Sequence, residues 1–207
     1  PTLTPKCEGS TATLTVAGTN ASIYQWQVNT GTGFTNIAGA TSASYTTAAI
    51  TAAMNNNSYQ VLVSNANCAA IATSNPVTLT VNALPTVTAT SSEPSVCTGT
   101  AVTLTATGAT SYTWAPGTIP ALDVVTVNPQ VNPSNPDVAN PVTYTVTGTD
   151  GNGCQNTANV TVIASPLPVV TLTASPAITK ILPGQSVTLT ASVNPGTGFG
   201  FTWTKDG

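Results

Sequence analysis

Four cysteines are the residues of this chain with the clearest capacity for chemistry. Cys7, Cys68, Cys97 and Cys154 are spread along the sequence, which contains no histidine and no CxxC pair. Structural zinc needs closely spaced thiolate or imidazole ligands, so we expect disulfides rather than a metal centre. Disulfides persist in oxidising compartments, which predicts an extracellular or periplasmic protein.

The sequence offers no catalytic set. A Ser/His/Asp or Cys/His arrangement needs a histidine, and the chain has none. No paired carboxylates follow strands toward a common cleft, and no glycine-rich phosphate loop follows a strand. We therefore expect a protein that is not an enzyme and that uses no cofactor.

Charged side chains are scarce. Lys and Arg number 3 and Asp and Glu number 6 among 207 residues, for a net charge of -3. So few cations cannot neutralise phosphates, which argues against nucleic acid and against an anionic membrane surface as partners. No apolar run reaches the roughly 18 residues of a membrane-spanning helix, so we expect no direct membrane insertion.

The elements that position these residues recur along the chain. Trp26, Trp114 and Trp203 are the only tryptophans, 88 and 89 residues apart, and each follows an alternating segment with a central leucine. Those leucines are Leu14, Leu104 and Leu189. A period of nearly 90 residues indicates repeated domains, two of them complete and a third that stops early.

Alternation of apolar residues with threonine predicts sheets with one buried face. Leu14 lies between Thr13 and Thr15, and Leu104 lies between Thr103 and Thr105. This period of two is typical of half-buried strands, and threonine favours extended backbone while its hydroxyl stays solvated. We expect a structural core that contains Leu14, Trp26, Tyr59, Leu104, Trp114, Tyr144, Leu189 and Trp203.

Short proline-containing junctions separate the repeats. We place domain 1 at 1–83, domain 2 at 84–165 and the N-terminal part of an incomplete domain 3 at 166–207. The prediction is an all-β chain of tandem immunoglobulin-like β-sandwich domains in a rod-like array. The missing strands of domain 3 belong either to a longer chain or to a neighbouring chain that supplies them by strand addition.

The chain resembles the tandem immunoglobulin-like and PKD-like repeats of large secreted surface proteins of Bacteroidota, including gliding-type adhesins exported by type IX secretion. The residues that carry the likeness are 95–105, with the motif Cys-Thr-Gly, Tyr112-Thr113-Trp114, and 143–154, which ends in Asp-Gly-Asn-Gly-Cys. Tyr59 and Tyr144 resemble the tyrosine corner of such sandwiches, whose hydroxyl bonds upstream backbone. The third repeat departs from this pattern, with Leu182-Pro183-Gly184 in place of Cys-x-Gly.

If the domains have immunoglobulin topology, the two cysteines of one repeat lie far apart. Cys7 and Cys68 are then displaced by roughly 15 to 20 Å each toward opposite ends of domain 1, and a disulfide tolerates only about 7 Å between Cα atoms. This favours an inter-domain bond between Cys7 and Cys154, with Cys68 and Cys97 left for other units. Pairs within each repeat, Cys7 with Cys68 and Cys97 with Cys154, remain the alternative, because both complete repeats carry both cysteines.

Two candidate ligand sites have simpler explanations. Glu8, Asp150 and Asn152 come together if Cys7 meets Cys154, but calcium takes about six to eight oxygens, so we favour a solvated surface and no metal. The tryptophans could stack on sugars, yet their regular place on an inward strand face favours core packing.

The expected function is structural. We expect a non-catalytic, extracellular stalk or filament segment of a bacterial surface adhesin, whose partners are neighbouring immunoglobulin-like domains and, secondarily, surface glycans or other cell-surface proteins. One rival is an accessory or carbohydrate-binding module of a secreted hydrolase. The other is a strand-complemented, self-assembling fibre subunit.

Overall fold

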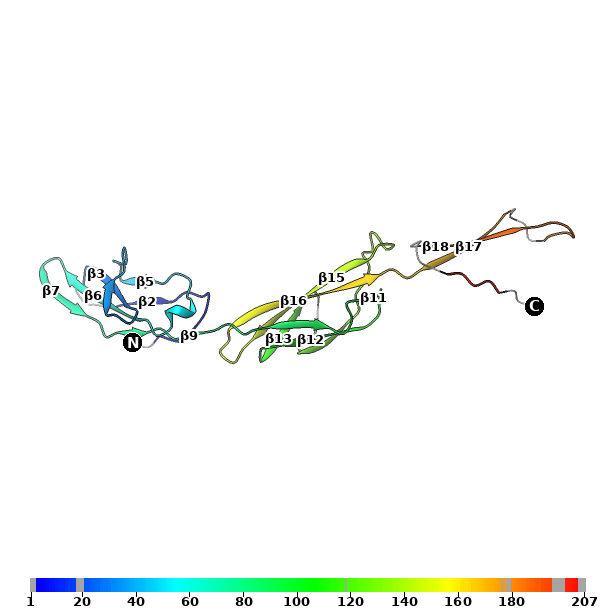
Figure 1. Cartoon of the computed structure of the whole chain (residues 1–207). Helices are drawn as coiled ribbons and strands as arrows, with labels where there is room; N and C mark the ends of the chain where they lie inside the picture. The colour runs from blue at the N-terminus through cyan, green and yellow to red at the C-terminus, as the bar shows by residue number, and fades with distance from the viewer. Residues whose placement is uncertain are drawn as a thin grey trace. The chain divides into compact units, whose positions relative to one another are not determined.

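The chain is all-β (Figure 1). The computed structural model describes residues 3–17, 21–117, 119–175, 177, 180–194 and 200–204, without the side chains of residues 68 and 69. Within these ranges the one helical element is a short 3-10 turn, η1 (Ala52–Met54). No helix in the described part of the chain is long and apolar enough to cross a bilayer.

The chain folds into two compact units. The first comprises residues 1–87 together with 108–111 and 147–157. The second comprises residues 88–107, 112–146 and 158–207. The two short internal ranges of the first unit include the loop before the strand Ser111–Ala115 and the loop between the strands Asn140–Thr149 and Gln155–Ser165.

Two hydrogen-bonded layers form the first sandwich. A small sheet pairs β2 (Thr13–Thr15) with β5 (Ser44–Thr46), and the larger sheet has the order β4-β3-β6-β7, with β8 also paired to β6. β1 (Lys6–Cys7) runs parallel to β9 (Val81–Asn82). The strands of the larger sheet are β3 (Ile23–Asn29), β4 (Phe34–Asn36), β6 (Ser58–Asn65), β7 (Cys68–Thr73) and β8 (Val77–Thr78).

The core of the first sandwich contains the residues that alternation predicts. Leu14, Trp26 and Tyr59 are buried, and they belong to one apolar cluster with Val61 and Leu79. The ring of Tyr45 lies 6.2 Å from that of Trp26 and 6.2 Å from that of Tyr59, centroid to centroid. Such aromatic neighbours add to the stabilisation that burial of their area provides.

The second sandwich repeats this plan. Its sheets have the orders β10-β12-β14 and β11-β16-β15-β13, and β11 pairs parallel with β16 as β1 does with β9. The strands are β10 (Thr88–Ser91), β11 (Ser95–Cys97), β12 (Val102–Thr107), β13 (Ser111–Ala115), β14 (Val124–Val127), β15 (Asn140–Thr149) and β16 (Gln155–Ser165).

This strand order defines an immunoglobulin-like sandwich. In each domain the strand that carries the tryptophan pairs with the tyrosine strand, while the preceding leucine strand pairs in the other sheet. Consecutive strands therefore cross between two packed layers, as in the immunoglobulin arrangement. Leu104, Trp114 and Tyr144 fill the second core, with Val146 and Val162 fully buried beside them.

In the described part of the third segment, β17 (Val169–Ser175) pairs antiparallel with β18 (Thr188–Asn194), and Figure 1 shows the pair as a ribbon. The prediction that Leu189 and Trp203 belong to a core is wrong, because Leu189 is 48% exposed and Trp203 54% exposed. The physical reason is that no second sheet covers β17 and β18 among the described residues. Residues 200–204, which include Trp203, form no strand.

Candidate functional site

A tight turn follows Cys7. The amide of Glu8 donates to the Asn82 carbonyl (2.9 Å), which continues the parallel pairing of β1 with β9. Gly9 has φ +83°, a left-handed conformation that glycine adopts without steric cost, and its amide donates to the Ile50 carbonyl (2.8 Å). The Ser10 amide then donates back to the Cys7 carbonyl (3.2 Å). These bonds fix the backbone that follows Cys7.

The loop between β15 and β16 places Cys154. The Asp150 carboxylate accepts the amides of Asn152 (2.9 Å) and Cys154 (2.8 Å) through the same oxygen, and the Asp150 amide donates to the Cys154 carbonyl (2.9 Å). Aspartate is favoured at such turns because its side chain can replace a backbone acceptor. Cys154 is only 1% exposed. The short polar loop therefore holds a buried sulfur.

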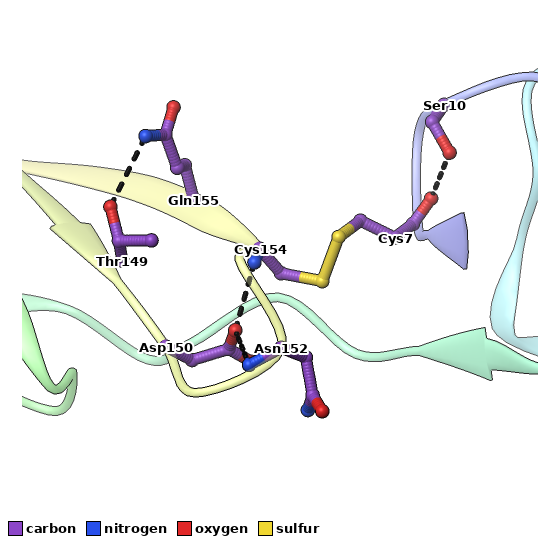
Figure 2. The surroundings of a disulfide bond; sticks show 7 residues. All are labelled: Cys7, Ser10, Thr149, Asp150, Asn152, Cys154 and Gln155. Carbon is purple, nitrogen blue, oxygen red and sulfur yellow. Dashed lines mark hydrogen bonds between the residues drawn. A yellow bond between two sulfur atoms is a disulfide. The ribbon is translucent and has the colours of Figure 1, made fainter. Parts of the chain in front are cut away.

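Cys7 and Cys154 form a disulfide (Figure 2), with Cα atoms 5.5 Å apart and 147 positions apart in sequence. The structure thus contains the predicted Cys7–Cys154 pairing and excludes the pairs Cys7–Cys68 and Cys97–Cys154. Cys97 is an exposed free thiol. Cys68 begins β7, and its side chain lies outside the described part of the structure.

Two of the three calcium candidates, Glu8 and Asp150, accept backbone amides. A carboxylate oxygen of Glu8 accepts the amide of Ala52 (3.1 Å), the first residue of η1, and Asp150 accepts two amides of its own loop. Asn152 is exposed at the tip of that loop. No group of three or more His, Cys, Asp or Glu residues gathers anywhere in the described ranges. The role of Glu8 in capping η1 was not predicted, because its partner lies 44 positions away.

The first two tryptophans are anchored core residues. The indole N–H of Trp26 donates to the Ser42 carbonyl (2.9 Å), and that of Trp114 donates to the Leu122 carbonyl (2.9 Å). A buried indole needs such a partner. Both rings are buried, so neither offers a face to a sugar.

The corner tyrosines are buried beside the tryptophan strands. Burial raises the pKa of Tyr59, and a hydrogen bond with the Asn57 side chain offsets part of that rise. Burial alone raises the pKa of Tyr144.

A small cavity of about 190 Å³ opens in the first sandwich. It lies among core residues that include Leu14, Trp26 and Val61. Pockets that bury a drug-sized ligand are larger, about 300 to 1,000 Å³, and they combine an apolar lining with charged or strongly polar anchors. Ser74 and Asn75 contribute to this lining, but no charged side chain does among the residues that the structure describes. The cavity is therefore a packing feature of the sandwich.

Residues 3–83 match a family described only as a domain of unknown function, DUF8696, which covers less than half of the chain. No curated protein matches the sequence. The matched residues 3–83 include all of β1 to β9, which form the first sandwich. The family description therefore adds no function to the fold.

Solved structures with similar features are immunoglobulin domain arrays. The four N-terminal Ig domains of Dscam1 isoform 6.9 share 15% identity over 76% of this chain and 42% of theirs (TM-score 0.33). The eight N-terminal Ig domains of DSCAM share 14% identity over 94% of this chain and 30% of theirs (TM-score 0.33). An amphioxus IgVJ-C2 molecule shares 12% identity over 74% of this chain and 96% of its own (TM-score 0.30). The chain spans less than half of either Dscam structure. At these TM-scores the fold assignment rests on strand order and core.

An immunoglobulin-like fold suggests a non-catalytic structural or binding domain, and function must be argued from the site that it carries. Here the site with the best-defined geometry is the disulfide crosslink. The Cys7–Cys154 bond, the turn after Cys7 and the loop before Cys154 together form a crosslink whose backbone is held by hydrogen bonds on both sides.

Proposed function

We propose that the chain is a non-catalytic segment of an extracellular stalk or filament in a bacterial surface adhesin. In this proposal residues 1–83, 84–165 and 166–207 are successive immunoglobulin-like domains. The resemblance of the Cys-Thr-Gly and Asp-Gly-Asn-Gly-Cys motifs to surface-protein repeats of Bacteroidota supports export by type IX secretion. A disulfide also suits an extracellular location.

The disulfide is the observation that carries this proposal. A force applied to the two ends of the chain passes through the disulfide from Cys7 to Cys154, because this is the shortest covalent connection. The residues between the two cysteines therefore carry no load while the bond is intact. That loop contains all of β2 to β15, and therefore most of both cores. Unfolding of these strands cannot lengthen the segment while the bond is intact. A spacer under tension benefits from this limit, whereas a catalytic or carrier domain does not need it.

The exposed surface suits a spacer that contacts only its neighbours. Threonines occupy outward positions of β2 and are paired across strands, for example Thr13 with Thr46 (2.9 Å between hydroxyl oxygens). Thr88 and Thr107 (2.7 Å) form the same pair in the second sandwich. These hydroxyls keep sheet surfaces hydrated without charge. Neighbouring immunoglobulin-like domains are the partners that we propose.

Single-molecule pulling from the two termini tests the mechanical role. With the disulfide intact, we expect no extension from the residues between Cys7 and Cys154. After reduction, the released contour length should grow by roughly 500 Å, because those 147 positions extend by up to about 3.6 Å each. The Cys97→Ser variant is the matched control and should behave as the parent does. Equal extension before and after reduction would remove the basis of the proposal.

An accessory carbohydrate-binding module is the second candidate, and one observation favours it. Phe201 is 47% exposed and Trp203 54% exposed, two positions apart in the third segment. Exposed aromatic faces can stack on sugar rings. Binding to a glycan array that Trp203→Ala abolishes and Phe34→Ala does not would favour this function, whereas we expect no glycan binding by the parent chain.

A further inference from the structure

Three turns of the same form occur in the three repeats. They begin at Cys7, Cys97 and Leu182, and the third residue of each is a glycine with φ +83°, +79° and +86°. In each turn the fourth amide donates to the first carbonyl, at 3.2, 3.0 and 3.0 Å. The sequence Leu182-Pro183-Gly184 thus keeps the turn and replaces only the sulfur.

Cys97 occupies the same backbone setting as Cys7. β11 pairs parallel with β16 as β1 pairs with β9, and the amide after the cysteine donates to Ser165 (2.8 Å) where Glu8 donates to Asn82 (2.9 Å). The Gly99 amide donates to the Pro129 carbonyl (2.8 Å), the counterpart of the bond from Gly9 to Ile50 (2.8 Å). Two equivalent turns therefore present a sulfur, yet only that of Cys7 is bonded.

The Cys97 turn is held as firmly as the Cys7 turn. The Thr98 hydroxyl donates to the side-chain carbonyl of Gln130 (3.0 Å) and accepts the Val131 amide (3.1 Å). The Asn140 side chain donates to the Gln130 carbonyl (2.9 Å), which fixes this proline-containing loop. The free thiol is consequently exposed on an ordered turn.

The third segment presents an apolar sheet face to solvent. One face of the β17–β18 ribbon is entirely apolar, with Val170 opposite Val193, Leu172 opposite Ala191 and Ala174 opposite Leu189. The other face is formed by Thr171, Thr173, Thr190 and Ser192 with their neighbours. Val170 is 63% exposed and Leu172 62% exposed, so this apolar face is uncovered. In a folded domain such a sheet face is covered by a second apolar layer.

The second sandwich shows what covers such a face. β10 and β12 are the counterparts of β17 and β18, and they too are antiparallel. The apolar side chains of β12, Val102, Leu104 and Ala106, are buried together with those of β13, β15 and β16. β13, β15 and β16 belong to one sheet, and the loop that joins β15 to β16 carries Cys154. A sheet that covers β17 and β18 in the same way would therefore contain a counterpart of the β15–β16 hairpin.

We propose that Cys97 is the disulfide attachment site for a cysteine in the hairpin of the second sheet of the domain that β17 and β18 begin. This inference rests on the proposed function, because it makes the Cys7–Cys154 bond the first of a series between successive domains. Leu182 in the third turn ends that series. Two thiols lose two protons and two electrons as the bond forms, and a disulfide oxidant accepts them and becomes two thiols.

A chimera of this chain supplies the proposed partner. Residues 115–165 are appended after Trp203 in place of 204–207, so that a second copy of β15 and β16 follows the third tryptophan. A Thr157→Ser change in the appended copy distinguishes its peptides by mass. We expect alkylation of Cys97 to be lost until the protein is reduced, and non-reducing peptide mapping to join Cys97 to the appended cysteine.

The controls separate pairing from folding. In the parent chain we expect Cys97 to be alkylated without reduction, because its thiol is free and exposed. In the chimera with Cys97→Ser, the appended cysteine should become alkylatable while Cys7–Cys154 stays intact. A blue shift of Trp203 emission, measured in the Trp26→Phe, Trp114→Phe background, reports that the third sheet has formed. Full alkylation of Cys97 in a chimera that shows this shift would overturn the proposal.

Protein isolated from its own source under alkylating conditions gives the test that needs no chimera. A Cys97 peptide joined to a cysteine hairpin of the following domain supports the proposal. A Cys97 peptide recovered as the alkylated thiol, or joined to a second copy of this chain, overturns it. Neither result depends on the pulling experiment, since extension across Cys7–Cys154 is measured without reference to Cys97.

Discussion

At Gly108 a single added carbon would meet the backbone. A Cβ at this position lies 1.8 Å from the Thr86 carbonyl oxygen, and the residue has φ +93°. Gly117 has a similar φ of +90° but nothing within 4 Å of its Cβ. Left-handed backbone costs about 1 to 2 kcal/mol for a residue with a side chain.

The pair of alanine variants separates conformational cost from steric clash. We expect Gly117→Ala to lower the free energy of unfolding by about 1 kcal/mol. Gly108→Ala should lower it by about 3 kcal/mol, because backbone must move as well. Equilibrium urea unfolding followed by tryptophan fluorescence measures both. Equal losses in the two variants would show that the Gly108 contact relaxes without cost.

The two corner tyrosines predict a loss of stability in alkaline solution. Burial raises the pKa of Tyr59 and Tyr144 above the ordinary value of 10.0. Above pH 10 the unfolded chain therefore releases protons that the folded chain retains, so the free energy of unfolding falls as pH rises. Below pH 10 both states are protonated and this contribution is constant.

Tyr59→Phe and Tyr144→Phe should each make the stability less sensitive to pH between about 10 and 11. Urea unfolding at a series of pH values measures this slope. The Cys97→Ser background is needed, because a free thiolate at high pH would exchange with the disulfide. If both variants lose stability as steeply as the parent, groups other than these tyrosines cause the alkaline transition.

The disulfide is the element-scale feature with the largest expected effect on stability. Replacing both Cys7 and Cys154 by serine should lower the free energy of unfolding by about 2 to 4 kcal/mol, because a crosslink restricts the unfolded chain. Cys97→Ser should change it by less than about 0.5 kcal/mol, since that thiol is exposed. Urea unfolding of the three proteins measures the difference. A double variant as stable as the parent would mean that the bond limits extension without stabilising the fold.

The alternation of apolar residues and the tryptophan spacing predicted the buried positions correctly in the two sandwiches whose sheets are both present. Leu14, Trp26, Leu104 and Trp114 lie in buried positions because periodicity of two reports which side faces the core. The same pattern failed for Leu189 and Trp203, since periodicity identifies an apolar face and not the sheet that covers it. The Glu8 cap on η1 and the Thr86–Gly108 approach were not predicted, because both depend on distant backbone.

At the scale of the molecule, the first sandwich has what an independent domain needs. Within the described part of the chain, its apolar cluster runs from Leu3 to Val81 and contains no residue of a later repeat. All of β1 to β9 lie within the range 3–83 that matches DUF8696. The disulfide joins this sandwich to later residues, and the Asn156 side chain donates to the Pro85 carbonyl (3.0 Å) at the junction that follows it.

We therefore predict that residues 1–83 fold alone. The Cys7→Ser fragment, which avoids an unpaired thiol at that position, should unfold in urea in one cooperative transition that Trp26 emission reports. A domain of this size buries only about 60% of its unfolded surface, so a modest stability of roughly 5 kcal/mol is expected. Far-ultraviolet circular dichroism should follow the same transition. A fragment without cooperative unfolding would show that the crosslinked residues around Cys154 complete the domain, and that 83 is not its boundary.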